Sequence, residues 1–271
     1  MSPQRLLLLP GWALGPAPLE PLADALRQRL PDYHVECVRY PALTSHRPES
    51  WVAALDHQLP QDAWLAGWSL GGMLATSLAQ WRGRRARGLI TLGANASVVT
   101  RSGWPEAMTA ESVGEFQRAL RASPTRTFRR FAELSAQGGR DTHRLGRQLM
   151  EALATTPLDQ ALAGLGVLSA LDLREVLEAL KIPQLHLFGD SDALVPAAAR
   201  QAIAERLPEA GRTALIESAG HAFPVERPEE TADLMVTFMI SADGSRHAAE
   251  GSRHAADGSR HVAEGSRGPG S

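Results

Sequence analysis

A serine flanked by two glycines is the residue of this chain best suited to nucleophilic chemistry. Residues 67–71 read Gly-Trp-Ser-Leu-Gly and place Ser69 at the centre. This pattern holds a nucleophile when a strand precedes it and a helix follows it, because the sharp turn between them leaves no room for neighbouring Cβ atoms. A serine attacks at neutral pH only when a base takes its proton. The chemistry therefore requires a histidine and a carboxylate elsewhere in the chain.

His221 is the histidine placed best to act as that base. Where a serine occupies such a turn, the chain order is serine, then acid, then histidine. His221 follows a short apolar run and lies on a glycine-containing loop, where the base belongs. The other eight histidines precede Ser69, lie in the C-terminal repeat, or fall within helical or strand-like segments: His34, His46, His57, His143, His186, His247, His254 and His261.

Either of two aspartates could supply the carboxylate. Asp190 and Asp192 both follow the apolar run 184–188, and their spacing alone does not separate them. Asp192 lies deeper in the loop, from which it could reach His221. Asp190 adjoins Gly189 and suits a residue that forms a turn.

Two backbone amides should bind the oxyanion that forms during attack on a carbonyl. Leu70 directly follows the serine and supplies one of them. Trp12 supplies the other, since it lies in the loop after the first apolar run, where Gly11 permits close approach. The side chains of Trp12 and Trp68 would either form apolar walls beside Ser69 or simply belong to the core.

The elements that must position these groups alternate along the chain. Apolar runs predict strands at 6–9, 33–40, 64–68, 88–92, 184–188 and 213–217, and helical periodicity predicts helices at 19–30, 51–59, 73–81, 197–207 and 228–239. This alternation predicts an α/β fold with a mostly parallel sheet and helices on both faces. Residues from about 104 to 180 show helical patterns only, so we expect a helical cap over the strand ends, where such folds bind ligands.

Size and composition favour one large domain over residues 1–240. Residues 241–271 repeat a seven-residue unit with Gly-Ser in each copy, so we expect a disordered tail there. The net charge of −2 gives no general argument for nucleic-acid or membrane binding. The single cysteine, Cys37, excludes an internal disulfide and fits a reducing compartment. We expect a monomeric cytoplasmic protein without a membrane span, a cofactor or a metal ion.

Four motifs together resemble the α/β-hydrolase superfamily over residues 5–240. They are PGWALG, GWSLGG, GDSDALVP and GHAFPVERP, and the narrower resemblance is to the pimeloyl-[acyl-carrier protein] methyl ester carboxylesterases of biotin synthesis. The resemblance implies an α/β-hydrolase fold, a triad of Ser69, Asp192 and His221, and no cofactor. It thereby favours Asp192 over Asp190. Two departures are Pro10, where the family usually has histidine, and the order Ala-Phe-Pro after His221, where it usually has Ala-Pro-Phe.

The same resemblance implies the residues that contact the substrate. Five positions match: Trp12, Ser69, Leu70, Phe131 and His221. Trp12 and Leu70 match the oxyanion positions as well, and Phe131 matches an apolar contact from the cap.

Basic residues dominate part of the expected cap. Residues 118–147 contain eight arginines against only Glu133 and Asp141. Such a surface would steer an acidic partner, and an acyl carrier protein is strongly acidic. The family carries arginines at the positions of Arg126, Arg130 and Arg147. At a fourth such position this chain has His143, with Arg144 adjacent. The alternative is a solvated arginine-rich helix face without a partner.

The motifs thus predict a serine carboxylesterase, and the resemblance implies that it hydrolyses the methyl ester of pimeloyl-[acyl-carrier protein] in biotin synthesis. One alternative is a general short-chain carboxylesterase or thioesterase of the same fold. Another is a non-catalytic binding protein that kept the fold. The last alternative predicts that a triad residue is missing, and none is missing here.

Overall fold

One parallel sheet organises the protein, whose structure is a computed structural model describing residues 3–245. The strands lie in the order β2-β1-β3-β4-β5-β6, and each neighbouring pair is parallel. The strands are β1 (Gln4–Leu9), β2 (Tyr33–Cys37), β3 (Ala63–Trp68), β4 (Ala86–Leu92), β5 (Gln184–Gly189) and β6 (Gly211–Ile216). All six occur where the apolar runs predict them and differ from the predicted ranges only at their ends. Every residue of β3 and β5 is buried, as expected where both faces of a parallel sheet are covered.

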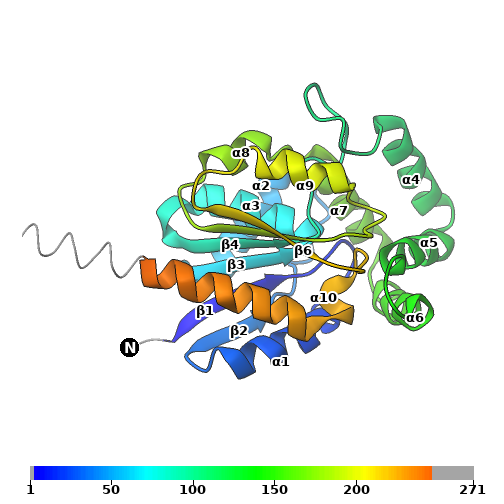
Figure 1. Ribbon diagram of the computed structural model, residues 1–271. Helices are drawn as coiled ribbons and strands as arrows, with labels where there is room; N and C mark the ends of the chain where they lie inside the picture. Colours follow the sequence, from blue (N-terminus) through cyan, green and yellow to red (C-terminus); the bar gives the residue numbers. More distant parts are fainter. Residues whose placement is uncertain (1–2, 246–271) are drawn as a thin grey trace, which may run out of the picture.

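Helices cover both faces of the sheet (Figure 1). On one face lie α1 (Glu20–Arg29) and a long helix over residues 228–245. Arg29 of α1 joins them through ion pairs of 2.8 Å to Glu229 and 2.7 Å to Asp233. The other face carries α2 (Pro48–Gln58), α3 (Leu70–Arg82), α8 (Arg174–Ala179) and α9 (Ala197–Ala204). Three short helical turns complete the connections: η1 (Ala17–Leu19), η2 (Gly83–Arg85) and α10 (Phe223–Glu226).

The cap consists of four helices between β4 and α8. They are α4 (Ala110–Ala122), α5 (Pro124–Ala136), α6 (Thr142–Leu153) and α7 (Leu158–Ala170). Figure 1 shows them beyond the carboxyl ends of the strands. Local sequence marks where they begin, since Thr109 accepts a hydrogen bond from the Ser112 amide and Asp141 accepts one from the Arg144 amide. The expected cap range of about 104–180 also includes α8, which packs against α3 of the sheet layer.

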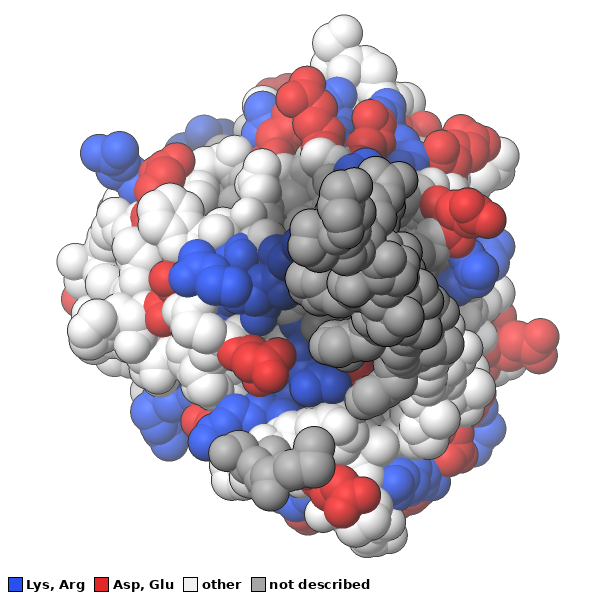
Figure 2. Space-filling model, turned by 90° about the vertical axis from the view of Figure 1, so that its left-hand side faces the viewer, with Lys and Arg blue, Asp and Glu red and all other residues white. Residues whose placement is uncertain are grey.

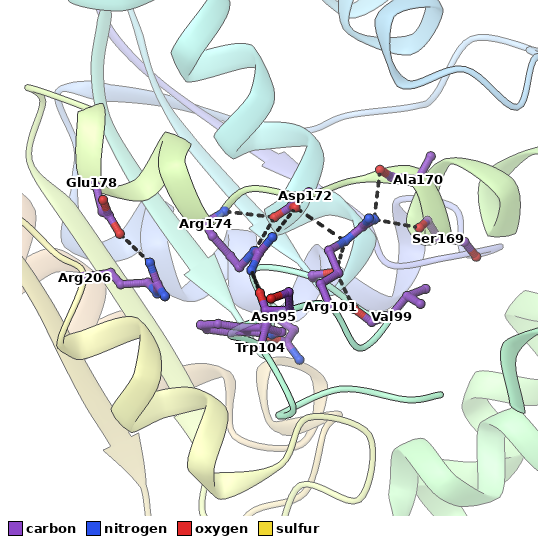
Figure 3. A network of polar contacts seen from close by, with 12 residues as sticks. Asn95, Val99, Arg101, Trp104, Ser169, Ala170, Asp172, Arg174, Glu178 and Arg206 are labelled. Atoms are coloured by element: carbon purple, nitrogen blue, oxygen red, sulfur yellow. Dashed lines mark hydrogen bonds and ion pairs between the residues drawn. The ribbon is translucent and has the colours of Figure 1, made fainter. Parts of the chain in front are cut away.

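A polar network fixes the segment between β4 and the cap (Figure 3). Asp172 accepts two hydrogen bonds of 2.8 Å from Arg174, and these bonds lower the pKa of its carboxyl group. Asp172 also pairs with Arg101 at 3.5 Å, and Arg101 contacts the carbonyl oxygens that end α7. Trp104 is fully buried beneath the guanidinium of Arg206, which lies 5.6 Å from the ring centroid. The segment therefore forms a fixed wall beside the site described below.

The end of the domain differs from its predicted boundary at residue 240. Residues 241–245, expected to belong to a disordered tail, continue the last helix. They are held because Asp243 accepts a hydrogen bond from the Tyr33 hydroxyl and pairs with Arg87 at 3.4 Å. Residues 246–271, the rest of the predicted tail, lie outside the described residues. Figure 2 shows the end of the molecule opposite the cap, where basic and acidic side chains are interspersed.

Candidate functional site

Ser69 lies on a strained turn between the last residue of β3 and the first residue of α3. Its backbone has φ +56° and ψ −119°, a conformation that costs about 1–3 kcal/mol for a non-glycine residue. A Cβ on Gly67 would lie 2.2 Å from the backbone of Gly71, and a Cβ on Gly71 would lie 2.2 Å from the Leu9 carbonyl oxygen. Only glycine fits at both positions. The strand, turn and helix predicted around Ser69 are present.

His221 and Asp192 form a buried pair. The Nδ1 atom of His221 lies 2.8 Å from Oδ2 of Asp192, and the two side chains are 2% and 1% exposed. The other oxygen, Oδ1, accepts hydrogen bonds from the amides of Leu194 and Val195 at 2.8 and 2.9 Å. The carboxylate is thus held by the backbone and in turn orients the imidazole ring. Within residues 3–245, His221 Nε2 is buried and has no hydrogen-bond partner.

Asp190 holds the backbone near His221 and does not bond its ring. Its Oδ1 atom accepts hydrogen bonds from the Ala219 amide at 3.1 Å and the Ser191 hydroxyl at 2.9 Å. The amides of Ser218 and Ala219 lower the pKa of the Asp190 carboxyl group. The geometry therefore separates two aspartates that spacing left equivalent. Asp192 contacts the imidazole, and Asp190 braces the loop that carries it.

Trp68 contacts the loop of His221 in a way that sequence reasoning missed. Its indole Nε1 donates a hydrogen bond of 3.0 Å to the His221 carbonyl oxygen, and the two rings lie 5.8 Å apart. Gly93 was missed as well. It follows β4 with φ +55°, and a Cβ there would lie 3.3 Å from His221 Nδ1 and 3.4 Å from Asp192 Oδ2. The sequence signal that could have pointed to Gly93 is its position directly after β4, the strand that pairs with β3.

The two expected oxyanion donors lie at the start of α3 and in the loop after β1. Leu70 is the first residue of α3, so its amide has no acceptor within the helix. Trp12 lies in a turn closed by a 3.2 Å hydrogen bond from the Leu14 amide to the Gly11 carbonyl oxygen. The first turn of α3 packs directly on the end of β1, because Gly71 carries no side chain.

An apolar pocket lies over Ser69 and His221, enclosed by the cap. Both residues line it, together with Trp12, Met73, Gly93, Ala94, Asn95, Val98, Ala107, Met108, Val113, Phe116, Phe131, Leu134, Leu165, Leu168, Leu194 and Val195. Phe131 of α5 meets Trp12 edge to face at 4.9 Å and lines the pocket, and its contact with a substrate stays a prediction. The amide group of Asn95 is already bonded to Trp104 and to the Glu106 carbonyl oxygen. The pocket therefore suits an apolar chain that ends in a reactive carbonyl.

The four arginines expected to dock a partner are exposed on α5 and α6, which pack against each other. Arg126 and Arg130 lie one turn apart on α5. On α6, Arg147 contacts His143 Nδ1 at 3.2 Å, and Arg144 pairs with Asp141 at 3.5 Å. Over the described range, Arg126, Arg130 and Arg147 form no ion pair with a carboxylate. These three arginines therefore keep positive charge that is not paired with a carboxylate of the described residues.

No helix within residues 3–245 combines the length and the apolar character needed to cross a bilayer.

Comparisons with known proteins agree with this architecture. The model of the alpha/beta hydrolase family matches residues 6–234. A pimeloyl-[acyl-carrier protein] methyl ester esterase of Aromatoleum aromaticum is 35% identical over 253 residues, which cover 87% of this chain and 98% of the relative. An esterase of the same name from Aeromonas hydrophila is 31% identical, with 86% and 94% covered.

Solved structures support the fold independently. A bromoperoxidase from Bacillus anthracis superposes with a TM-score of 0.79 at 19% identity, covering 88% of this chain and 92% of that one. An esterase from Exiguobacterium antarcticum gives the same TM-score, identity and coverage. At this identity the likeness concerns the fold alone, and it confirms the predicted parallel sheet with helices on both faces.

Proposed function

Because the chain belongs to the alpha/beta hydrolase family, we propose that it is a serine carboxylesterase that hydrolyses the methyl ester of pimeloyl-[acyl-carrier protein] in biotin synthesis. The observation that carries the proposal is that His221, bonded to the buried Asp192 at 2.8 Å, lines one pocket with Ser69. The names of relatives at 35% and 31% identity support the choice of substrate.

The first half of the reaction forms an acyl-enzyme. His221 Nε2 takes the proton of Ser69 Oγ as this oxygen attacks the ester carbonyl carbon. The amides of Trp12 and Leu70 donate hydrogen bonds to the resulting oxyanion. Asp192 keeps Nδ1 protonated and stabilises the positive charge on the ring. When the tetrahedral intermediate collapses, the C–O bond to the methoxy group breaks, and His221 delivers the proton that makes methanol.

The second half releases the acid. A water molecule gives a proton to His221 Nε2 and attacks the acyl carbon, and the new intermediate expels Ser69 Oγ, which recovers the proton. The products are a free carboxylate and the restored enzyme. These steps use only groups of this chain and water.

The pocket explains which end of the substrate reacts. A carrier protein is far too large to enter, so the end of the acyl chain remote from the carrier must reach Ser69. The apolar lining then contacts the methylene groups of the chain, while Ser69 and His221 meet the methyl ester. Phe131, Trp12 and the other apolar residues of the wall bind the chain without offering competing hydrogen bonds.

The arginines of α5 and α6 give the carrier protein a docking surface. Arg126, Arg130 and Arg147 present positive charge that is not neutralised by carboxylates of the described chain, and Arg144 lies beside them. An acidic carrier would be steered toward the cap and held beside the pocket. A monomeric state and a cytoplasmic location stay predictions from the sequence.

The test compares two substrates, methyl pimeloyl-carrier protein and a p-nitrophenyl ester of a short acid, at equal concentration. Mass spectrometry of the carrier should show that methyl pimeloyl-carrier protein loses its methyl group, while the thioester to the carrier stays intact. A p-nitrophenyl ester of a short acid should react with a much lower kcat/KM. Equal kcat/KM for both esters would favour the general esterase, and cleavage of the thioester would favour the thioesterase.

A further inference from the structure

The turn that carries Trp12 contains a residue in an unfavourable backbone conformation. The turn spans residues 11–14, and Ala13, its third residue, has φ +54°. A positive φ at this position is typical of a type II turn, which usually places glycine there. An alanine persists in this conformation only when its surroundings hold it.

Two hydrogen bonds from the cap hold the turn. The Thr156 hydroxyl, in the connection between α6 and α7, donates to the Ala13 carbonyl oxygen at 2.7 Å. The indole Nε1 of Trp12 donates to the Ala161 carbonyl oxygen of α7 at 2.8 Å. Gly164 lets α7 approach, since a Cβ there would lie 3.2 Å from the indole.

Aromatic contacts hold the same indole from the other cap helices. Phe116 of α4, Phe128 and Phe131 lie 5.5, 5.8 and 4.9 Å from Trp12 between ring centroids. These contacts fix the side chain of Trp12, but they do not fix the Gly11–Trp12 peptide, which carries the Trp12 amide. The hydroxyl of Thr156 is bonded to the main chain of the turn itself.

We propose that Thr156 is a positioning residue for the oxyanion site. Its hydroxyl holds the Ala13–Leu14 peptide, whose amide donates to the Gly11 carbonyl oxygen at 3.2 Å. Because that carbonyl belongs to the same peptide as the Trp12 amide, the hydroxyl fixes the direction of the Trp12 amide, and the cap thereby completes the oxyanion hole of the sheet. The inference rests on the proposed hydrolase function, in which the Trp12 amide binds the oxyanion. It assigns to the cap a role in the chemical step in addition to enclosing the substrate.

The test uses three single variants. Thr156→Val removes the hydroxyl and keeps the shape, and Thr156→Ser restores a hydroxyl. Thr155→Val is the matched control, because the Thr155 hydroxyl bonds to Ala152 within the cap. Loss of a whole oxyanion donor lowers kcat by about 10²–10³-fold. Since Thr156→Val only misdirects the Trp12 amide, we expect it to lower kcat about tenfold and to leave KM unchanged. Thr156→Ser and Thr155→Val should stay within about twofold of the wild type.

A binding measurement separates positioning from folding. A trifluoromethyl ketone forms a tetrahedral adduct whose oxygen occupies the oxyanion site, whereas the matching amide binds without that charge. Thr156→Val should weaken binding of the ketone about tenfold relative to binding of the amide. The ratio of the two affinities does not depend on the fraction of folded protein. Thr156→Ala repeats this measurement should the valine variant be insoluble.

An unchanged ratio in Thr156→Val or Thr156→Ala would overturn the proposal, as would an equal loss of kcat in Thr155→Val. Failure of the proposed function gives a different result, because the wild type itself would then neither hydrolyse the methyl ester nor bind the ketone covalently.

Discussion

The carboxyl edge of the sheet fixes reacting groups through the backbone, whereas the cap shapes the pocket through side chains. At the edge, Gly67 and Gly71 create the turn of Ser69, and two amides clamp Asp192. In the cap, phenylalanines from α4 and α5 pack around Trp12. The groups at the edge are therefore held by main-chain geometry. The cap supplies apolar side chains to the wall of the pocket.

Removing the nucleophile tests the edge most severely. Ser69→Ala should lower kcat by roughly 10⁴-fold or more, leaving only oxyanion stabilisation and binding. KM should change little, because the pocket wall is intact. Single-turnover assays on methyl pimeloyl-carrier protein would measure this loss. Activity within tenfold of the wild type would show that Ser69 is not the nucleophile.

The two aspartates provide a matched pair at the edge. Asp192→Asn should lower kcat by about 10²–10⁴-fold, because the amide no longer stabilises the charged imidazole or its tautomer. Asp190→Asn should lower kcat less than tenfold and mainly reduce Tm, since Asp190 bonds the loop and not the ring. Equal losses of kcat in both variants would contradict the distinction drawn from the geometry.

Charge reversal on the cap tests the docking surface. The double variant Arg126→Glu, Arg130→Glu should raise KM for the carrier-linked ester about tenfold and leave p-nitrophenyl ester hydrolysis unchanged. A control with the same change of net charge is Arg84→Glu, Arg85→Glu, at the exposed turn η2 before β4. The arginines of α5 would not be a specific docking site if both double variants raised KM for the carrier-linked ester, or if neither did.

His186 offers the smallest effect on activity and a distinct effect on stability. It is buried on β5, its Nδ1 lies 2.7 Å from the Thr91 hydroxyl, and burial lowers its pKa to about 3. Below about pH 6.5 the imidazole of His186 binds a proton in the unfolded chain but stays neutral in the folded chain. His186 therefore lowers the free energy of unfolding progressively from about pH 6.5 toward pH 3. Urea unfolding of His186→Gln should show a smaller loss of unfolding free energy over this pH range than the wild type shows. Parallel curves of unfolding free energy against pH for the two proteins would refute this prediction.

The sequence was informative where backbone geometry decides the structure. A nucleophile turn needs small residues at fixed spacing, so Ser69, its strand and its helix were readable, and the chain order then selected His221. Asp190 and Asp192 could not be separated by spacing, because only the folded loop shows which carboxylate meets the ring. The resemblance selected Asp192, and the 2.8 Å contact with His221 agrees.

Contacts between distant segments were not readable in the same way. The hydrogen bonds from Trp68 to His221 and from Thr156 to Ala13 join residues 153 and 143 positions apart. No local pattern encodes such a pair, because each partner satisfies its own local structure without the other. The helical continuation over residues 241–245 was missed for the same reason, since it depends on Tyr33 and Arg87.

Covalent labelling shows whether Ser69 is an activated nucleophile. A fluorophosphonate would be added separately to the unmodified protein, to Ser69→Ala and to His221→Ala. Mass spectrometry of the intact protein and peptide mapping would then locate any adduct. We expect one adduct, on Ser69, in the unmodified protein and none in Ser69→Ala. Labelling should be at least about 10³-fold slower in His221→Ala. Absence of an adduct in the unmodified protein, or its location on another serine, would show that Ser69 is not the activated nucleophile.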